Sequence, residues 1–369
     1  MPTVSSTHAS SWGTATLGGH RVNVRTLVFW GGIAFWIGNL ILHTGTNGIG
    51  ALWTSLLFVA EVAIIASATR TITLQRVVVL YCLGGAMMGV GWLISVTWHT
   101  LMPDPDAVST QFFIPMVEEL VKLAPVVFIA WRQRKTRLWT MGASDFLLMG
   151  AASGAGFGLV EEAHIRILLG TPLPLAWFPI SRINGVTLTV GHGMWTALAA
   201  ATVGLALLWR PRRPIVYLLG ASGVLWTWFD HSHHNYGVRR TGTSVDLFNF
   251  VTAHGWLSLY FLLIALVVAL ASDLNVIYRA LPRIPELKTP FAGFFASIQN
   301  AMSAWKFLLT KRAIAFVAFH YKKEPPSVQS GQLEPILYSL LETLFELRQT
   351  RTPSVPGPSE TAPEVIKSV

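Results

Sequence analysis

The first three quarters of the chain alternate between long apolar runs and short polar or basic segments. Several runs approach or reach the roughly 20 residues that a helix needs to cross the hydrocarbon layer of a bilayer. They lie at about 27–43, 49–69, 77–97, 112–131, 144–169, 184–209, 214–235 and 249–271. The pattern predicts an all-α fold, that of a polytopic helical membrane protein with about eight transmembrane helices.

Basic residues gather in every second segment between these runs. The clusters are Arg70 and Arg76; Arg132, Arg134, Lys135 and Arg137; Arg210, Arg212 and Arg213; and Arg279, Arg283 and Lys288. Cytoplasmic loops carry an excess of Lys and Arg, so this distribution predicts that the N-terminus and the C-terminus are both cytoplasmic. Arg239 and Arg240, in a predicted outer loop, oppose this orientation, but the other clusters outweigh them.

The same pattern divides the chain into parts. Residues 1–26 are predicted to be an N-terminal cytoplasmic tail, and residues 27–271 a transmembrane core. Residues 272–350 are predicted to form cytoplasmic amphipathic helices, with a basic helix at 289–321 on the membrane surface and an associating helix at 332–350. Residues 351–369, rich in Pro, Ser and Thr, are predicted to be a disordered tail.

Composition narrows the class of partner. Hydrophobic residues make up 52% of the 369 residues and charged residues only 12%, whereas soluble domains carry roughly 25% charged residues. The formal net charge of +9 lies mostly in short loops, which favours contact with the lipid bilayer over contact with nucleic acid. The single cysteine, Cys82, excludes an intramolecular disulfide and a zinc site built from several thiolates.

Two adjacent glutamates and a lysine interrupt the run 112–131. Placing Glu118, Glu119 or Lys122 in hydrocarbon costs about 2.5 kcal/mol or more each on insertion scales. Glu118 and Lys122 are four residues apart and share one helix face, whereas Glu119 is turned about 100° away. Ionisable groups within spans are functional by default, so these residues are candidates for a general base and an orienting lysine. A structural ion pair between helices is the alternative.

Three further runs contain side chains that could act with them. Glu161, one turn after Phe157, is a candidate metal ligand or member of a proton network. His192 lies between two glycines, so little side-chain bulk shields it. His231 and Asn235 lie one turn apart beside other His and Asp residues, a composition that can bind a divalent metal. Packing or interfacial roles are the alternatives, and no role is assigned to Glu162, His164, His233, His234 and His254.

The predicted orientation places the candidate residues at one depth. At 1.5 Å of rise per residue, the candidates in four runs fall roughly 6–12 Å below the outer surface. Those residues are Glu118, Glu161, His192 and His231. The common depth predicts one water-accessible site that four helices share.

The order of these residues resembles the PrsW family of intramembrane proteases, which belongs to the same wider group as the CAAX prenyl endopeptidases and the Abi proteins. The resemblance covers roughly residues 75–271 and rests on Glu118-Glu119-x-x-Lys122, Phe157-x-x-x-Glu161, His192 and His231-x-x-x-Asn235. It implies a metal-dependent endopeptidase of a bacterial cell membrane. Its implied substrate is a single-span membrane protein, such as an anti-sigma factor, that is cut on the extracytoplasmic side.

This resemblance leads to a hypothesis for the chemistry. Glu118 or Glu119 takes a proton from a water that attacks a peptide carbonyl, and Lys122 orients them. In one version Glu161, His192 and His231 hold Zn²⁺, which acidifies the water. In a metal-free version His231 and Asn235 donate hydrogen bonds to the oxyanion. A proton-coupled transporter or channel and a non-enzymatic membrane scaffold stay open as other classes.

Overall fold

The computed structural model describes residues 14–17, 20–102, 104, 108–133, 140–169, 180–183, 187–208, 215–239, 242–280, 298–321 and 326–349. Most of the predicted N-terminal tail and all of the predicted disordered tail lie outside these residues.

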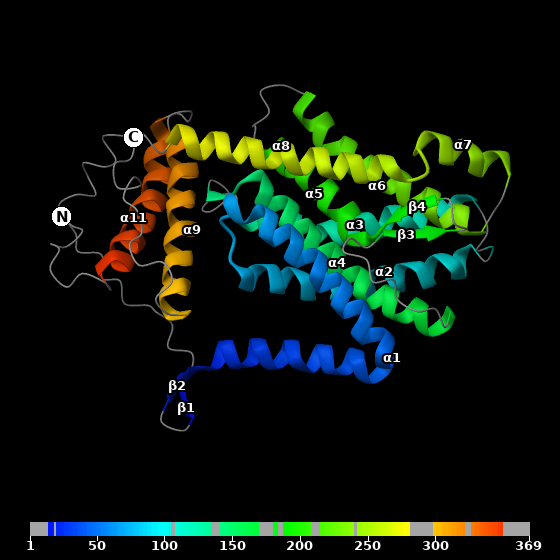
Figure 1. The fold of residues 1–369 in the computed structure, drawn as a ribbon, viewed down its shortest axis with the longest axis horizontal. Coiled ribbons are helices and arrows are strands. Elements are labelled where there is room, and N and C mark those ends of the chain that lie inside the picture. The colour runs from blue at the N-terminus through cyan, green and yellow to red at the C-terminus, as the bar shows by residue number, and fades with distance from the viewer. Residues whose placement is uncertain are drawn as a thin grey trace.

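The fold is helical, with two short antiparallel hairpins (Figure 1). In chain order the elements are β1 (Thr14–Leu17), β2 (His20–Asn23), α1 (Val24–Ile65), the 3₁₀ turn η1 (Ala66–Ala68), α2 (Leu74–Leu101), α3 (Val108–Gln133), α4 (Ala143–Leu169), β3 (Ile180–Ile183), β4 (Thr187–Val190), α5 (His192–Leu208), α6 (Ile215–Arg239), α7 (Thr243–Val251), α8 (Trp256–Ala280), α9 (Ile298–Tyr321), α10 (Pro326–Val328), the π-helical turn η5 (Gln329–Leu333) and α11 (Glu334–Gln349).

Four helical segments in the described part of the chain are long and apolar enough to cross a membrane: Gly48–Ala68, Leu74–Leu101, Ala143–Ala163 and Thr243–Ala280. The predicted number of about eight spans is therefore not reproduced. Helix α5 has only 17 residues, and charged side chains interrupt the apolar stretch of α3. The two runs predicted at 27–43 and 49–69 form one 42-residue helix, α1, which Figure 1 shows as two arms joined at a sharp bend.

Two of the other predicted spans are interrupted. The run 184–209 contains strand β4, and its helix begins only at His192. The sequence of β4 is Thr-Leu-Thr-Val, and three of these four residues are β-branched, a type that favours strands. The run 249–271 contains the turn between α7 and α8, where Ala253, His254 and Gly255 have φ values of 48°, 56° and 85°. Three successive residues with positive φ cannot continue a right-handed helix.

Helix α4 lies at the centre of the bundle. Of its most apolar stretch, 94% is buried, compared with 28–33% for the other three membrane-length segments. It packs against α1, α2, α3, α5 and α8. A Cβ on Gly156 would collide with the backbone carbonyl of Tyr81 in α2, so glycine is required for this close approach. The packing fixes the position of the residues that α4 contributes to the site.

Two buried carboxylates hold the N-terminus of α4. Asp273 of α8 accepts hydrogen bonds from the backbone N–H groups of Ala143 and Ser144, both at 2.8 Å. Asp145 accepts hydrogen bonds of 2.8–3.1 Å from the backbone N–H groups of Gly142, Thr71 and Ile72. A helix N-terminus has unpaired N–H groups and a partial positive charge, and carboxylates satisfy both. Helix α4 is thereby attached to α8 and to the α1–α2 connection.

Helices α9 and α11 form a separate apolar cluster at one end of the bundle, beside the end of α8 (Figure 1). Tyr321 of α9 donates a 2.7 Å hydrogen bond to Glu334 of α11. This bond raises the pKa of Tyr321 to about 12. Helices thus occur within the predicted amphipathic region 272–350, and their place at a membrane surface stays a prediction.

Candidate active site

A buried ion pair on α3 forms the innermost part of the site. The Lys122 ammonium donates a hydrogen bond to Glu119 Oε1 at 2.6 Å. The same oxygen accepts a 2.8 Å hydrogen bond from His231 Nδ1 of α6. The side chains of Glu119, Lys122 and His231 are 2%, 0% and 2% exposed. The sequence placed Glu118 on the same face as Lys122, but the observed pair is Glu119–Lys122, because residues three apart on a helix are neighbours too.

Lys122 also connects α3 with α5. Its ammonium lies 2.8 Å from His192 Nδ1. An ammonium only donates, so Nδ1 is the acceptor and the proton of the neutral His192 ring is on Nε2. The ring centroids of Phe157 and Trp195 lie 5.2 and 5.6 Å from the ammonium, within the range of cation–π attraction. Lys122 is therefore surrounded by a carboxylate, an imidazole and two aromatic rings.

Glu161 of α4 contacts the other nitrogen of His192. Its Oε2 lies 2.5 Å from His192 Nε2, within ion-pair distance. Phe157, one turn earlier on α4, has its ring centroid 5.4 Å from that of His192. The four-residue spacing of Phe157 and Glu161 thus brings both side chains to one histidine. Glu161 is 18% exposed and His192 is 11% exposed, and Glu118 is also 11% exposed. These three residues form the more open side of the site.

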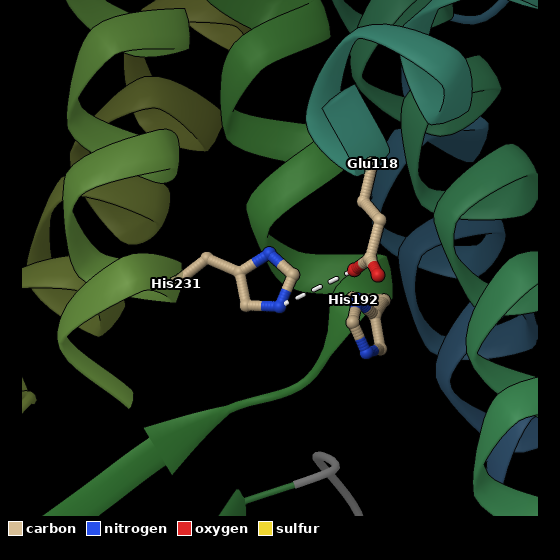
Figure 2. A group of neighbouring side chains, drawn as sticks. All are labelled: Glu118, His192 and His231. Carbon is tan, nitrogen blue, oxygen red and sulfur yellow. Dashed lines mark ion pairs between the residues drawn. The ribbon is translucent and has the colours of Figure 1, made fainter. Parts of the chain in front are cut away.

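Glu118 faces the second nitrogen of His231 (Figure 2). Glu118 Oε2 and His231 Nε2 are 3.6 Å apart, which is longer than a hydrogen bond. Because His231 Nδ1 donates to Glu119, Nε2 of the neutral ring is an acceptor. The Glu118 carboxylate is an acceptor too in the deprotonated form that a general base requires. Among the described residues, none forms a hydrogen bond with Glu118 Oε2. Two facing acceptors are satisfied by a donor or a cation between them, such as a water or a metal ion.

Three residues have the arrangement that a metal ion needs. Ligand atoms of Glu118, His192 and His231 all lie within 4.8 Å of one another. Tetrahedral zinc, with bonds of about 2.0–2.2 Å, separates its ligands by about 3.4 Å. The 3.6 Å between Glu118 and His231 is close to that separation, and two imidazoles with one carboxylate are a ligand set that zinc accepts. The three residues would therefore fit a zinc ion once His192 gives up its contact with Lys122 or with Glu161. Glu118 then stands where the sequence predicted Glu161.

The other polar residues singled out in the sequence lie around this network. Asn235 is half-buried on α6, and no hydrogen bond joins it to Glu118 or Glu119 in the described structure, so its role at the oxyanion stays a prediction. His233 is bonded to Asn249 of α7 at 3.1 Å. His234 and Glu162 are half-buried, His254 lies in the turn after α7, and the side chain of His164 lies outside the described residues.

The sequence did not single out Trp195, which borders the site on α5. Its ring stacks on the His231 ring with centroids 4.4 Å apart and planes at 22°. It also meets the His192 ring edge-on at 5.4 Å. The sequence could have indicated this position, because Trp195 lies three residues after His192 and residues at that spacing share a helix face. An aromatic residue in an apolar run more often faces lipid or the core, so the signal is weak.

Comparison with known protein families matches residues 73–271 to the family described as PrsW family intramembrane metalloprotease. Comparisons with curated proteins and with solved structures find no match. The family match covers the helices that supply the site, and it coincides with the region of resemblance found in the sequence. Together with the apolar, membrane-length helices, it identifies an integral membrane protein that is an intramembrane protease: the chain belongs to the PrsW family.

Proposed function

We propose that the protein is an endopeptidase that hydrolyses a peptide bond of a membrane-protein substrate with a glutamate-activated water. The observation that carries this proposal is the facing pair of acceptors, Glu118 Oε2 and His231 Nε2, 3.6 Å apart. A water beside this pair can donate one hydrogen to each atom at about 2.8 Å. Its lone pairs then point away from both, toward an incoming carbonyl carbon.

The two glutamates have different roles in this proposal. Glu118 is the general base that takes the proton of the attacking water and delivers it to the leaving amine. Glu119 holds His231 in the Nδ1–H tautomer, as hydrogen-bond partners of functional histidines do. Lys122 neutralises Glu119, to which it donates at 2.6 Å. Glu118, which has no ion pair with a lysine or arginine among the described residues, is left to react.

Zinc would be held by Glu118, His192 and His231, and when bound it would supply an acidified water and a polarised carbonyl. In that form Glu161, 2.5 Å from His192 Nε2, is the nearby carboxylate that remains to move the proton. The metal-free and zinc forms therefore differ in which glutamate is the base.

The proposed substrate is a single-span membrane protein, with anti-sigma factors as the class that the sequence resemblance implies. We place the cut near the extracytoplasmic face of a bacterial cell membrane, with both termini of the protease in the cytoplasm. The basic clusters in alternate loops support this orientation. Glu161, His192 and Glu118 are more exposed than Glu119, Lys122 and His231, which supports entry of substrate from the side of the first three.

The test is cleavage by the purified protein in liposomes, with a panel of reconstituted single-span proteins and product identification by mass spectrometry. Glu118→Gln and His231→Gln are each expected to lower the rate by about 10²–10⁴-fold, the usual contribution of general acid–base catalysis. Glu61→Gln is the matched control, because Glu61 is a carboxyl group on α1, which supplies no site residue. Wild-type rates in both site variants would overturn the proposal.

Metal content separates the two forms. Elemental analysis of the purified protein, followed by chelation and readdition of zinc, measures whether activity follows bound zinc. Stoichiometric zinc that is absent from His192→Gln supports the zinc form, whereas full activity without bound metal supports the metal-free form. Proton flux across the liposomes without cleavage of any panel member would instead favour a transporter or channel.

A further inference from the structure

Asp230 lies next to His231 on α6, but its side chain contacts Trp195 and Ser258 and not the glutamates of the site. It is 4% exposed. Its Oδ2 accepts a 2.7 Å hydrogen bond from Trp195 Nε1 and a 2.6 Å hydrogen bond from the Ser258 hydroxyl. Ser258 in turn accepts a 2.9 Å hydrogen bond from Trp226 Nε1. A buried carboxylate thus connects α5, α6 and α8 directly behind the site.

The indole of Trp195 is the part of this network that touches the site. One face stacks on His231 with ring centroids 4.4 Å apart. The ring also lies 5.6 Å from the Lys122 ammonium and meets the ring of His192 at 77°. One side chain therefore contacts all three nitrogen-bearing residues of the site.

The hydrogen bond from Trp195 to Asp230 determines how that indole lies. Nε1–H is the only polar group of a tryptophan side chain, so a single buried acceptor selects its rotation. The stacked indole then sets the plane of the His231 ring, and Glu119 sets the direction of Nδ1 at 2.8 Å. With both constraints met, Nε2 faces Glu118.

We propose that Asp230 is a positioning residue, which holds His231 toward Glu118 by fixing the indole of Trp195. The inference rests on the proposed function, because it concerns how the His231–Glu118 pair is aligned for the attacking water. Asp230 does not touch that pair itself, and Ser258 and Trp226 hold the carboxylate in place from α8 and α6.

Kinetics of Asp230→Asn and Trp195→Phe test the proposal. Asparagine keeps the size of the side chain but replaces the charged acceptor with a weaker, neutral amide oxygen. Phenylalanine keeps a stacked ring but removes the N–H donor. Each is expected to lower kcat by about 10–100-fold, as loss of partners behind a site does, with KM within about twofold. The double variant is expected to be no slower than the slower single variant, because both changes act on the same hydrogen bond between Trp195 and Asp230.

Asp273→Asn is the matched control for the loss of a buried carboxylate. Asp273 is 1% exposed and also accepts several hydrogen bonds. It lies at the N-terminus of α4, about 26 Å along that helix from Glu161 at 1.5 Å per residue. This variant is expected to lower thermal stability while kcat per folded protein stays unchanged. A kcat in Asp230→Asn equal to that of this control would overturn the proposal, as would multiplicative losses in the double variant.

A second measurement does not require activity. Nitrogen-15 NMR of histidine-labelled protein reports which ring nitrogen carries the proton, and loss of a signal in His231→Gln assigns it. Wild-type His231 is expected to show a protonated Nδ1 and an unprotonated Nε2, and Asp230→Asn to add a second, Nε2–H population. An unchanged His231 signal would overturn the inference even if cleavage is confirmed. A changed signal together with full activity of both Glu118→Gln and His231→Gln would leave the inference standing and overturn the proposed function.

Discussion

Replacement of Lys122 by methionine tests the electrostatic basis of the site. Methionine fills most of the apolar stem in a position with no exposed surface, but it removes the charge at 2.6 Å from Glu119 Oε1 and 2.8 Å from His192 Nδ1. Removal of one partner of a buried ion pair costs about 3–5 kcal/mol, because the other charge stays buried without compensation. Glu119 keeps its 2.8 Å hydrogen bond from His231. We therefore expect Lys122→Met to lower the free energy of unfolding by about 3 kcal/mol, the low end of that range.

The double variant Lys122→Met/Glu119→Gln separates charge from packing. It leaves no buried charge at this pair, and an amide oxygen still accepts the hydrogen bond from His231. Replacement of both partners of a buried ion pair by neutral side chains often leaves stability unchanged. We therefore expect the double variant to regain most of the stability that Lys122→Met loses. Cleavage is expected to stay at least about tenfold below wild type in both variants, because His192 has lost the donor on Nδ1.

The assay is reversible unfolding in mixed detergent micelles, with cleavage measured on the same preparations. Lys306→Met is the control, because Lys306 is exposed on α9 and surface substitutions change stability by about 0.5 kcal/mol or less. The reasoning is refuted if Lys122→Met unfolds within about 1 kcal/mol of wild type, well below the cost of an unpaired buried charge. A double variant as unstable as Lys122→Met alone would refute it as well, since the loss would then come from packing.

Two further predictions concern the scaffold. Gly156→Ala places a methyl group against the Tyr81 carbonyl, whereas Gly89→Ala meets nothing within 4 Å. We expect the first variant to lower the free energy of unfolding by about 1–3 kcal/mol and the second to leave it nearly unchanged. Equal effects in the same unfolding assay would contradict the packing of α4 on α2. The pKa of Tyr321 is raised to about 12, above the unfolded value of about 10. The contribution of its hydrogen bond to folding stability is therefore fully present below pH 10 and is lost as the pH rises through 12. In the wild-type protein, limited proteolysis of α9 and α11 is expected to increase as the pH rises from 10 to 12, whereas Tyr321→Phe is expected to show no such pH dependence. The same pH profile in both proteins would contradict the hydrogen bond between Tyr321 and Glu334.

The sequence located most helices but not their breaks. Apolar runs of membrane length predict where helices lie, because only a helix satisfies its backbone within hydrocarbon. The same runs do not show whether a helix continues or turns. Thus the runs at 27–43 and 49–69 form one helix. The run at 249–271 is divided at Ala253 and His254, neither of which is a usual turn residue. These outcomes depend on packing between helices, which hydropathy does not contain.

The proximity of the candidate residues was predictable, because residues on separate helices share the membrane as a reference for depth. Glu118, Glu161, His192 and His231 were expected at one level, and the structure brings them into contact. Depth says nothing about rotation, so the sequence paired Lys122 with Glu118 and the structure pairs it with Glu119. The contacts of Asp230 and Trp195 were not predicted, because they join separate helices.

The adjacent glutamates acquire different roles from a single histidine. Consecutive residues on a helix point about 100° apart, so Glu118 and Glu119 reach different atoms of the same partner. His231 presents Nδ1 to Glu119 at 2.8 Å and Nε2 to Glu118 at 3.6 Å. A neutral imidazole carries one proton, so the nitrogen bonded to Glu119 is a donor and the nitrogen facing Glu118 is an acceptor. Glu119, which is bonded to His231, is also the glutamate paired with Lys122. In the proposed function Glu118 is therefore the one that shares a water or a metal with His231.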